Sequence, residues 1–128
     1  ATTVTRMKVR VFGGWDFDNN ALDAPDFVEL GYVQGVPMGG SLNAAQATAV
    51  PQMLIGAEMD AKYAKLDRVH VIKGWVDSAA AQHEQVYNAA WAGESILDGK
   101  GKLPATGNTV DIGSGHGDNS IGAPALAA

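Results

Sequence analysis

The segment LDRVHVIKGWVD (Leu66–Asp77) carries the clearest strand pattern in the chain. Apolar residues alternate here with polar ones, as they do on a half-buried strand. An extended backbone places three of them on one face and one on the other, namely Val69, Val71 and Trp75 against Ile72. Gly74 precedes the tryptophan, where a β-bulge would turn the indole. We therefore expect a strand over residues 67–76.

Further strands are expected on both sides of this stretch. HEQVYNAAWAG (His83–Gly93) follows a short turn and predicts a strand over 83–91. Alternation over Met7–Val11 and Met53–Ala57 predicts two more, and Asn108–Ile112 gives a short fifth. Gly13-Gly14 is expected to break or bulge the first of these, after which the strand resumes through Trp15 and Phe17.

Asp23-Ala24-Pro25-Asp26 predicts the start of one short helix, with Pro25 in its first turn, because proline fits a first helical turn. Five short strands between glycine-rich turns predict a mainly β fold. We expect an antiparallel β-sandwich or sheet with one short helix and long glycine-rich loops. The C-terminal run from Gly122 to Ala128 is expected to be a floppy tail or the start of a helix. The predicted core consists of Met7, Val9, Val11, Val69, Val71, Ile72, Trp75 and Val86.

Composition limits the function classes. The 128 residues are enough for a single β-rich domain over residues 1–128. A net charge of −5 without a basic block disfavours nucleic acid and anionic membranes. No apolar run approaches the roughly 18 residues that span a bilayer, so no membrane insertion is expected. The absence of cysteine excludes disulfides, thiol nucleophiles and cysteine-ligated metals.

Two weak metal-site candidates stand out. Asp16, Asp18 and Asn20 alternate like the first half of a calcium loop, but Ala21 and Phe27 occupy the positions that want Gly and a bidentate Glu. The alternative is a surface turn. The other candidate is the loop GSGHGDN (Gly113–Asn119), which brings His116 and Asp118 together. A metal there would need ligands from other segments, and a solvated loop is the alternative.

No catalytic residue and no cofactor are predicted for this chain. The serines lack a G-x-S-x-G context, and no oriented base accompanies them. The aromatic residues suit either a core or a carbohydrate-stacking platform, a choice that concerns Trp15, Trp75, Tyr87 and Trp91. The sequence begins at Ala1, so we expect a processed N-terminus or a fragment.

Several longer motifs resemble a known family. In order, they are RVFGGWDF (Arg10–Phe17), GVPMGG (Gly35–Gly40), LDRVHVIKGWVD (Leu66–Asp77), HEQVYNAAWAG (His83–Gly93), GKLPATGNTVD (Gly101–Asp111) and NSIGAPALA (Asn119–Ala127). Together they resemble the C-terminal part of the bacterial domain-of-unknown-function family thirty-six-oh-four. The chain departs from that family's pattern at Met59–Lys65 and Gly113–Asp118.

The resemblance implies a non-catalytic accessory domain, or a fragment, of a metal-dependent hydrolase related to PHP or amidohydrolase enzymes. The implied divalent metal belongs to the full-length relative, outside this chain, and the implied location is periplasmic or extracellular. If the chain is a fragment of a larger β-sandwich, one strand at the edge of its sheet lacks a hydrogen-bonding partner. The remainder of the polypeptide, a second copy in a homo-oligomer, or a partner strand would cover it. The alternative function is a stand-alone binding or assembly module that joins strand edges or binds carbohydrate or calcium.

Overall fold

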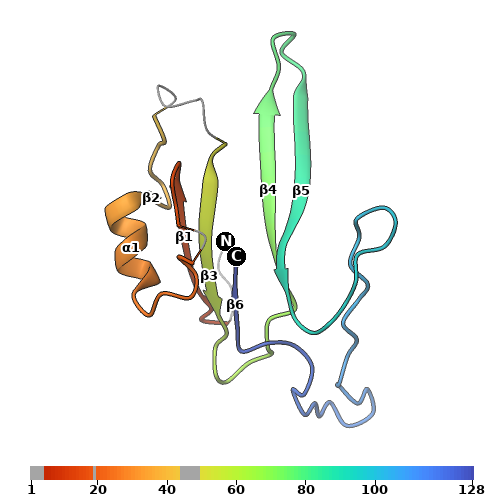
Figure 1. Cartoon of the computed structure of the whole chain (residues 1–128). Helices are drawn as coiled ribbons and strands as arrows, with labels where there is room; N and C mark the ends of the chain where they lie inside the picture. Colours follow the sequence, from red (N-terminus) through yellow and green to blue (C-terminus); the bar gives the residue numbers. More distant parts are fainter. Residues whose placement is uncertain (1–4, 19, 44–49) are drawn as a thin grey trace.

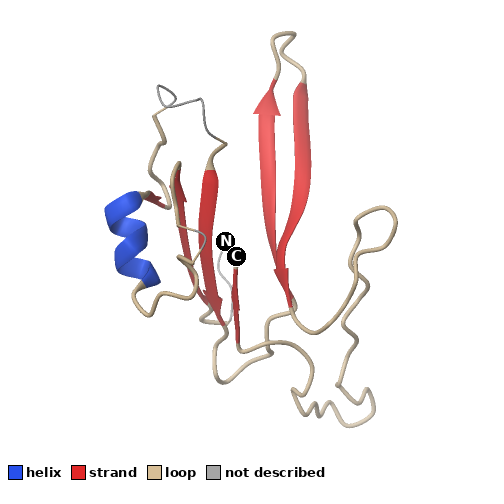
Figure 2. Ribbon diagram, viewed as in Figure 1, coloured by secondary structure: helices blue, strands red, loops and turns tan. Residues whose placement is uncertain are grey.

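The strands form two separate antiparallel sheets, which confirms the mainly β prediction. This is a computed structural model, and it describes residues 5–18, 20–43 and 50–128. The larger sheet has the order β2-β1-β3-β6, and β4 pairs with β5 in the smaller one (Figures 1 and 2). The strands are β1 (Lys8–Gly14), β2 (Val36–Pro37), β3 (Gln52–Glu58), β4 (Arg68–Val76), β5 (Gln82–Trp91) and β6 (Ala125–Ala127).

The β1–β3 pair is the centre of the larger sheet. Its register runs without interruption from Lys8 opposite Glu58 to Gly14 opposite Gln52. The predicted break at Gly13-Gly14 is therefore wrong, since both glycines are paired within β1. The strand also does not resume afterwards. Phe17 instead turns its ring into the core, held by the amide of residue 17 donating to Oε1 of Gln52 at 2.8 Å.

The predicted short helix is present as α1 (Phe27–Gln34), the only helix among the described residues, and it covers one end of the larger sheet (Figure 1). It begins at Phe27, so Pro25 lies in the turn before the helix and not in its first turn as predicted. Gly31 does not interrupt it and is its one buried residue. The ring of Phe12 lies against Gly31 and meets Tyr32 edge-on, with ring centroids 4.9 Å apart. Glycine is needed at this position because any side chain would collide with that ring.

The core of the described residues lies between α1 and the larger sheet. Its central cluster is Phe12, Phe17, Ala21 and Leu54, with Phe27, Val28 and Leu30 packed against it. None of the eight residues predicted for the core is buried. The alternating pattern correctly marked strands, but it does not reveal which strands another layer covers. Here the covered strands are β1 and β3, and the covering layer is α1.

The C-terminal run is a strand rather than a floppy tail or a helix. β6 pairs with the edge of β3, and the amide of Ile55 donates to the carbonyl of Ala128 at 2.7 Å. Alanine has little intrinsic preference for strands, so this strand depends on the partner that accepts its hydrogen bonds.

Two local predictions fail on the smaller sheet and its long connection. The irregularity in β4 lies between Val69 and His70, not at Gly74, which stays in register opposite Glu84. The predicted strand at Asn108–Ile112 reduces to one isolated bridge between Val110 and Gly117. Turn hydrogen bonds on both sides of Asp111 hold this stretch in a loop conformation.

Candidate interaction surface

The β4–β5 pair, called the ribbon below, stands beside the larger sheet and extends past it (Figure 1). Its apolar side chains are largely in solvent: Ile72 is 63% exposed, Val86 48% and Trp75 41%. Val76 and Tyr87 are exposed as well. Five large apolar side chains on one hairpin form the kind of surface that usually marks a contact with another molecule.

The register distributes these residues over both faces of the ribbon. Directly opposed residues share a face, and faces alternate along each strand. Ile72 lies opposite Val86 on one face, with Val76 two residues further along. Val71 lies opposite Tyr87 on the other face, which also carries Trp75. Both faces of the ribbon are therefore partly apolar, unlike a sheet that covers a core with one face and meets water with the other.

The base of the ribbon is fastened to the long loop that follows it. Arg68 donates from Nη2 to the carbonyl of Pro104 at 2.7 Å and from Nε to Oδ2 of Asp67 at 2.6 Å. The hydroxyl of Thr106 donates to the other oxygen of Asp67. Leu103 is buried beneath this cluster. These donors hold the pKa of Asp67 below its ordinary value, with the Arg68 hydrogen bond as the largest cause.

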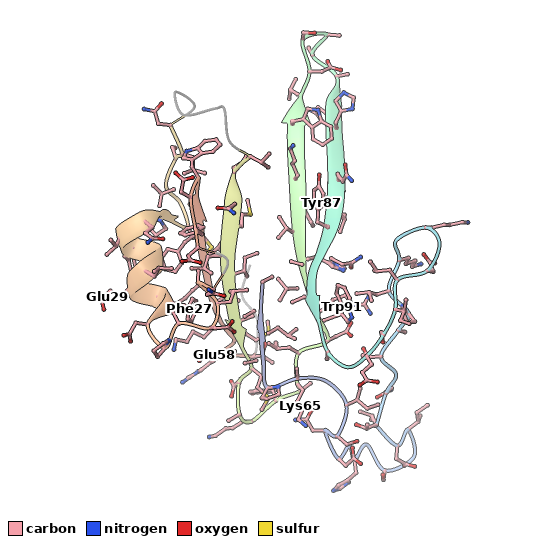
Figure 3. All side chains as sticks on the ribbon, viewed as in Figure 1. Phe27, Glu29, Glu58, Lys65, Tyr87 and Trp91 are labelled. Atoms are coloured by element: carbon pink, nitrogen blue, oxygen red, sulfur yellow. The ribbon has the colours of Figure 1, made fainter. Side chains whose placement is uncertain are left out.

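Trp91 provides a second attachment at the same end, where Figure 3 shows it at the base of the ribbon and Tyr87 further along. The indole Nε1 donates to the carbonyl of Ser95 at 2.8 Å. The amide of Ala92 donates to the carbonyl of Asp67 at 2.8 Å. The ribbon is therefore anchored at its base.

The tip of the ribbon has its own polar cluster. Asp77 accepts the amides of Ala79 and Ala81 at Oδ1, and His83 donates from Nε2 to its Oδ2 at 2.7 Å. These bonds lower the pKa of Asp77, and the bond from His83 is the largest cause. The imidazole also stacks on Trp75, with centroids 5.2 Å apart. The cluster fixes the turn and orients the indole, and the side chains of both Asp77 and His83 are partly open to water.

The calcium candidates lie at the surface next to the core. Asp16, Asp18 and Asn20 are all exposed. Asp18 accepts the amide of Asn20 at Oδ1, at 3.1 Å, so its carboxylate closes a local turn. The buried neighbours Phe17 and Ala21 fix this turn from inside.

The second pair of candidates is also spread over local turns. Asp118 accepts the amide and the hydroxyl of Ser120, which lowers its pKa, the hydroxyl being the larger cause. His116 is linked through its backbone to Asp111, whose carboxylate bonds Ser114. Within residues 5–18, 20–43 and 50–128, no three acidic or histidine side chains gather closely enough to hold a metal ion.

The three tryptophans do not form one stacking surface. Trp15 follows β1 in the larger sheet, whereas Trp75 and Trp91 lie on the ribbon. Trp75 is opposite His83, eight residues along β5 from Trp91, which corresponds to about 26 Å at the rise of a strand. Trp75 alone is exposed, and His83 already stacks on it.

The fold and this surface define a β-rich domain that displays an anchored but uncovered two-stranded ribbon. Residues 1–128 match the family described as Protein of unknown function (DUF3604), and the chain belongs to that family. No curated protein and no solved structure matches the chain. The family assigns no activity, and no helix in the described ranges has the length and apolar character to cross a membrane.

The sequence patterns identified apolar ribbon residues but predicted them to lie in the core. They did not reveal the hydrogen-bonded cluster of Asp67, Arg68 and Thr106 at the base of the ribbon, called the base cluster below. The acceptors for Arg68 are main-chain carbonyls in a loop 35 and 36 residues away, so no side-chain spacing signals them. One signal was available for the ribbon. A strand that is buried on both faces carries apolar side chains on both faces. Residues 69–76 have apolar side chains at both odd and even positions, and therefore on both faces of the strand.

Proposed function

We propose that this chain is a non-catalytic structural part of a larger hydrolase-like protein, and that the ribbon packs against the remainder of that polypeptide. The observation that carries the proposal is the exposure of apolar side chains on both faces of one hairpin. A two-stranded hairpin alone is marginally stable in water, so a long one with two apolar faces gains from a cover on each side.

The two-sided pattern favours the rest of the same polypeptide over a second copy. A twofold contact through the Ile72 face would leave Trp75 and Tyr87 in water, and the converse contact would leave Ile72 and Val86 exposed. A larger fold can enclose the ribbon on both sides. The firm attachment of its base through Arg68 and Trp91 holds the ribbon ready for such packing.

The resemblance to a metal-dependent hydrolase adds the class of that larger protein to the proposal. The acidic side chains with lowered pKa values, such as Asp77 and Asp118, are engaged in turns. The isolated chain mixed with divalent metals should therefore not turn over ester, phosphoester or amide substrates. Metal-dependent turnover that is lost in His116→Ala would overturn the proposal.

Lysine substitutions in the gene-encoded polypeptide test the docking itself. Ile72→Lys and Val86→Lys each place a charge on the ribbon, and Ile112→Lys is the matched control because Ile112 is 96% exposed in a loop. We expect the ribbon variants to lower the melting temperature of the whole polypeptide and the control to leave it unchanged. Equal behaviour of the three variants would refute docking through the ribbon. Association of the wild-type chain that Ile72→Lys abolishes would point instead to a second copy.

A further inference from the structure

A second site lies on the larger sheet, away from the ribbon. A pocket of about 200 Å³ opens beside the start of α1, and its apolar wall includes Leu22, Phe27, Ala57 and Leu126. Figure 3 shows Phe27 at the start of the helix, next to β3 and near Glu58. The pocket combines residues from β1, β3 and β6 with the segment that leads into the helix.

Gly56 allows the ring of Phe27 to line this pocket. A Cβ at residue 56 would fall 2.6 Å from Cζ of Phe27, so only glycine lets the ring approach β3. Across the sheet, Arg10 lies opposite Gly56 and Gly56 lies opposite Ala127, which places these three residues in one row on the same face. All three residues line the pocket.

The charges around the pocket are unbalanced. Lys8 pairs with Glu58, Nζ to Oε2 at 3.3 Å, on the neighbouring row. Arg10 is half-buried and lines the pocket, and it makes no ion pair or hydrogen bond with any residue the structure describes. A guanidinium always carries its charge and binds a carboxylate through two parallel hydrogen bonds.

We propose that this pocket binds a small monocarboxylate with an apolar body, whose carboxylate pairs with Arg10 and whose body lies against Phe27 and Leu22. The volume limits the size of the ligand. A cavity of about 150 Å³ holds one benzene molecule, so this pocket suits a single ring or a short aliphatic chain of similar bulk. Glu58 disfavours a second negative charge.

Phenylacetate is the probe, and phenylacetamide is its neutral partner with the same shape. We expect calorimetric titration of the chain to show phenylacetate binding, with affinity about tenfold weaker for phenylacetamide or for Arg10→Gln. Glu58→Gln should strengthen binding, because it removes a competing carboxylate and frees Lys8. Arg6→Gln is the control, since it removes the same charge from an exposed residue outside the pocket.

Amide chemical shifts locate the site in the same samples and verify that each variant is folded. Phenylacetate should move the signals of Gly56 and Ala127 in the wild-type chain and leave those of the ribbon in place. The proposal is overturned if phenylacetate does not bind, if the amide analogue binds equally well, or if Arg10→Gln keeps full affinity. It is also overturned if Arg6→Gln weakens binding as much as Arg10→Gln, because the effect would then reflect net charge.

Discussion

The ring of Phe12 lies directly on the backbone of Gly31, so that a Cβ at residue 31 would stand 2.4 Å from Cδ2 of the ring. This contact joins β1 to α1 and brings the only helix in the described residues onto the larger sheet. Two other glycines lie similarly close to a phenylalanine ring. A Cβ at Gly35 would fall 2.6 Å from Phe17, and one at Gly56 would fall 2.6 Å from Phe27.

Gly31→Ala should destabilise the chain although it improves helix propensity. Alanine is better than glycine in a helix by about 1 kcal/mol, but forcing a methyl group into a packed core typically costs 1–3 kcal/mol or more. The overpacking cost should lie at the upper end of this range because the methyl group would stand 2.4 Å from the ring, so we expect a net loss of about 2 kcal/mol in the free energy of unfolding, measured with urea. Gly99→Ala is the control, because nothing lies near Gly99. A stabilised Gly31→Ala variant would show that the ring does not contact the helix.

Trp75→Ala should cost much less than a core substitution in the isolated chain. The indole is 41% exposed, and its interactions are the stack with His83 and the approach of Lys73 Nζ, 5.3 Å from the ring centroid. We expect a loss below about 2 kcal/mol, against about 3–5 kcal/mol for Phe12→Ala. Urea unfolding of both variants decides the order, and equal losses would mean that the ribbon is packed in the isolated chain.

The base cluster should loosen in acid. The folded-state pKa of Asp67 is lowered from 3.8, chiefly by Arg68 and then by Thr106. A lowered pKa stabilises the folded state above 3.8, and this contribution is lost as the pH falls through the lowered value. Amide exchange over residues 93–107 should therefore accelerate well below pH 3.8, and Asp67→Asn should remove this pH dependence. Asp98→Asn is the control, because Asp98 bonds only within its own turn, to Lys100 and Lys102.

Pairing with β6 should stabilise the edge of β3 and protect it from association with other chains. Removal of Ala125–Ala128 deletes the two hydrogen bonds between Ile55 and Ala128 and uncovers Ala57, which pairs with Leu126. We expect a loss of about 2 kcal/mol or more, and association of the shortened chain through the open edge. Urea unfolding and sedimentation velocity measure the two effects. A shortened chain that keeps its stability and remains monomeric would show that β6 does not protect this edge.

Local patterns were sufficient to predict β1, β3, β4 and β5 but not their neighbours. The alternation in residues 69–76 correctly predicted β4, since strand periodicity is a property of the segment itself. The same alternation placed Ile72 in a core, because it holds no information about the opposite layer. β6 was missed for the converse reason, as Ala-Leu-Ala has no strand pattern until β3 pairs with it. Arg10 was taken as the polar side of a strand, and only the fold shows that it faces a pocket.

The solvent exposure of Trp75 shows whether the remainder of the polypeptide covers the ribbon. Fluorine NMR of fluorotryptophan-labelled protein, with the signal assigned through Trp75→Phe, reports that exposure in the 128-residue chain and in the whole gene-encoded polypeptide. We expect a solvent-accessible Trp75 in the chain and a shielded one in the polypeptide, together with slowed amide exchange along β4 and β5. A Trp75 signal equally accessible in both would show that the remainder of the polypeptide does not cover the ribbon.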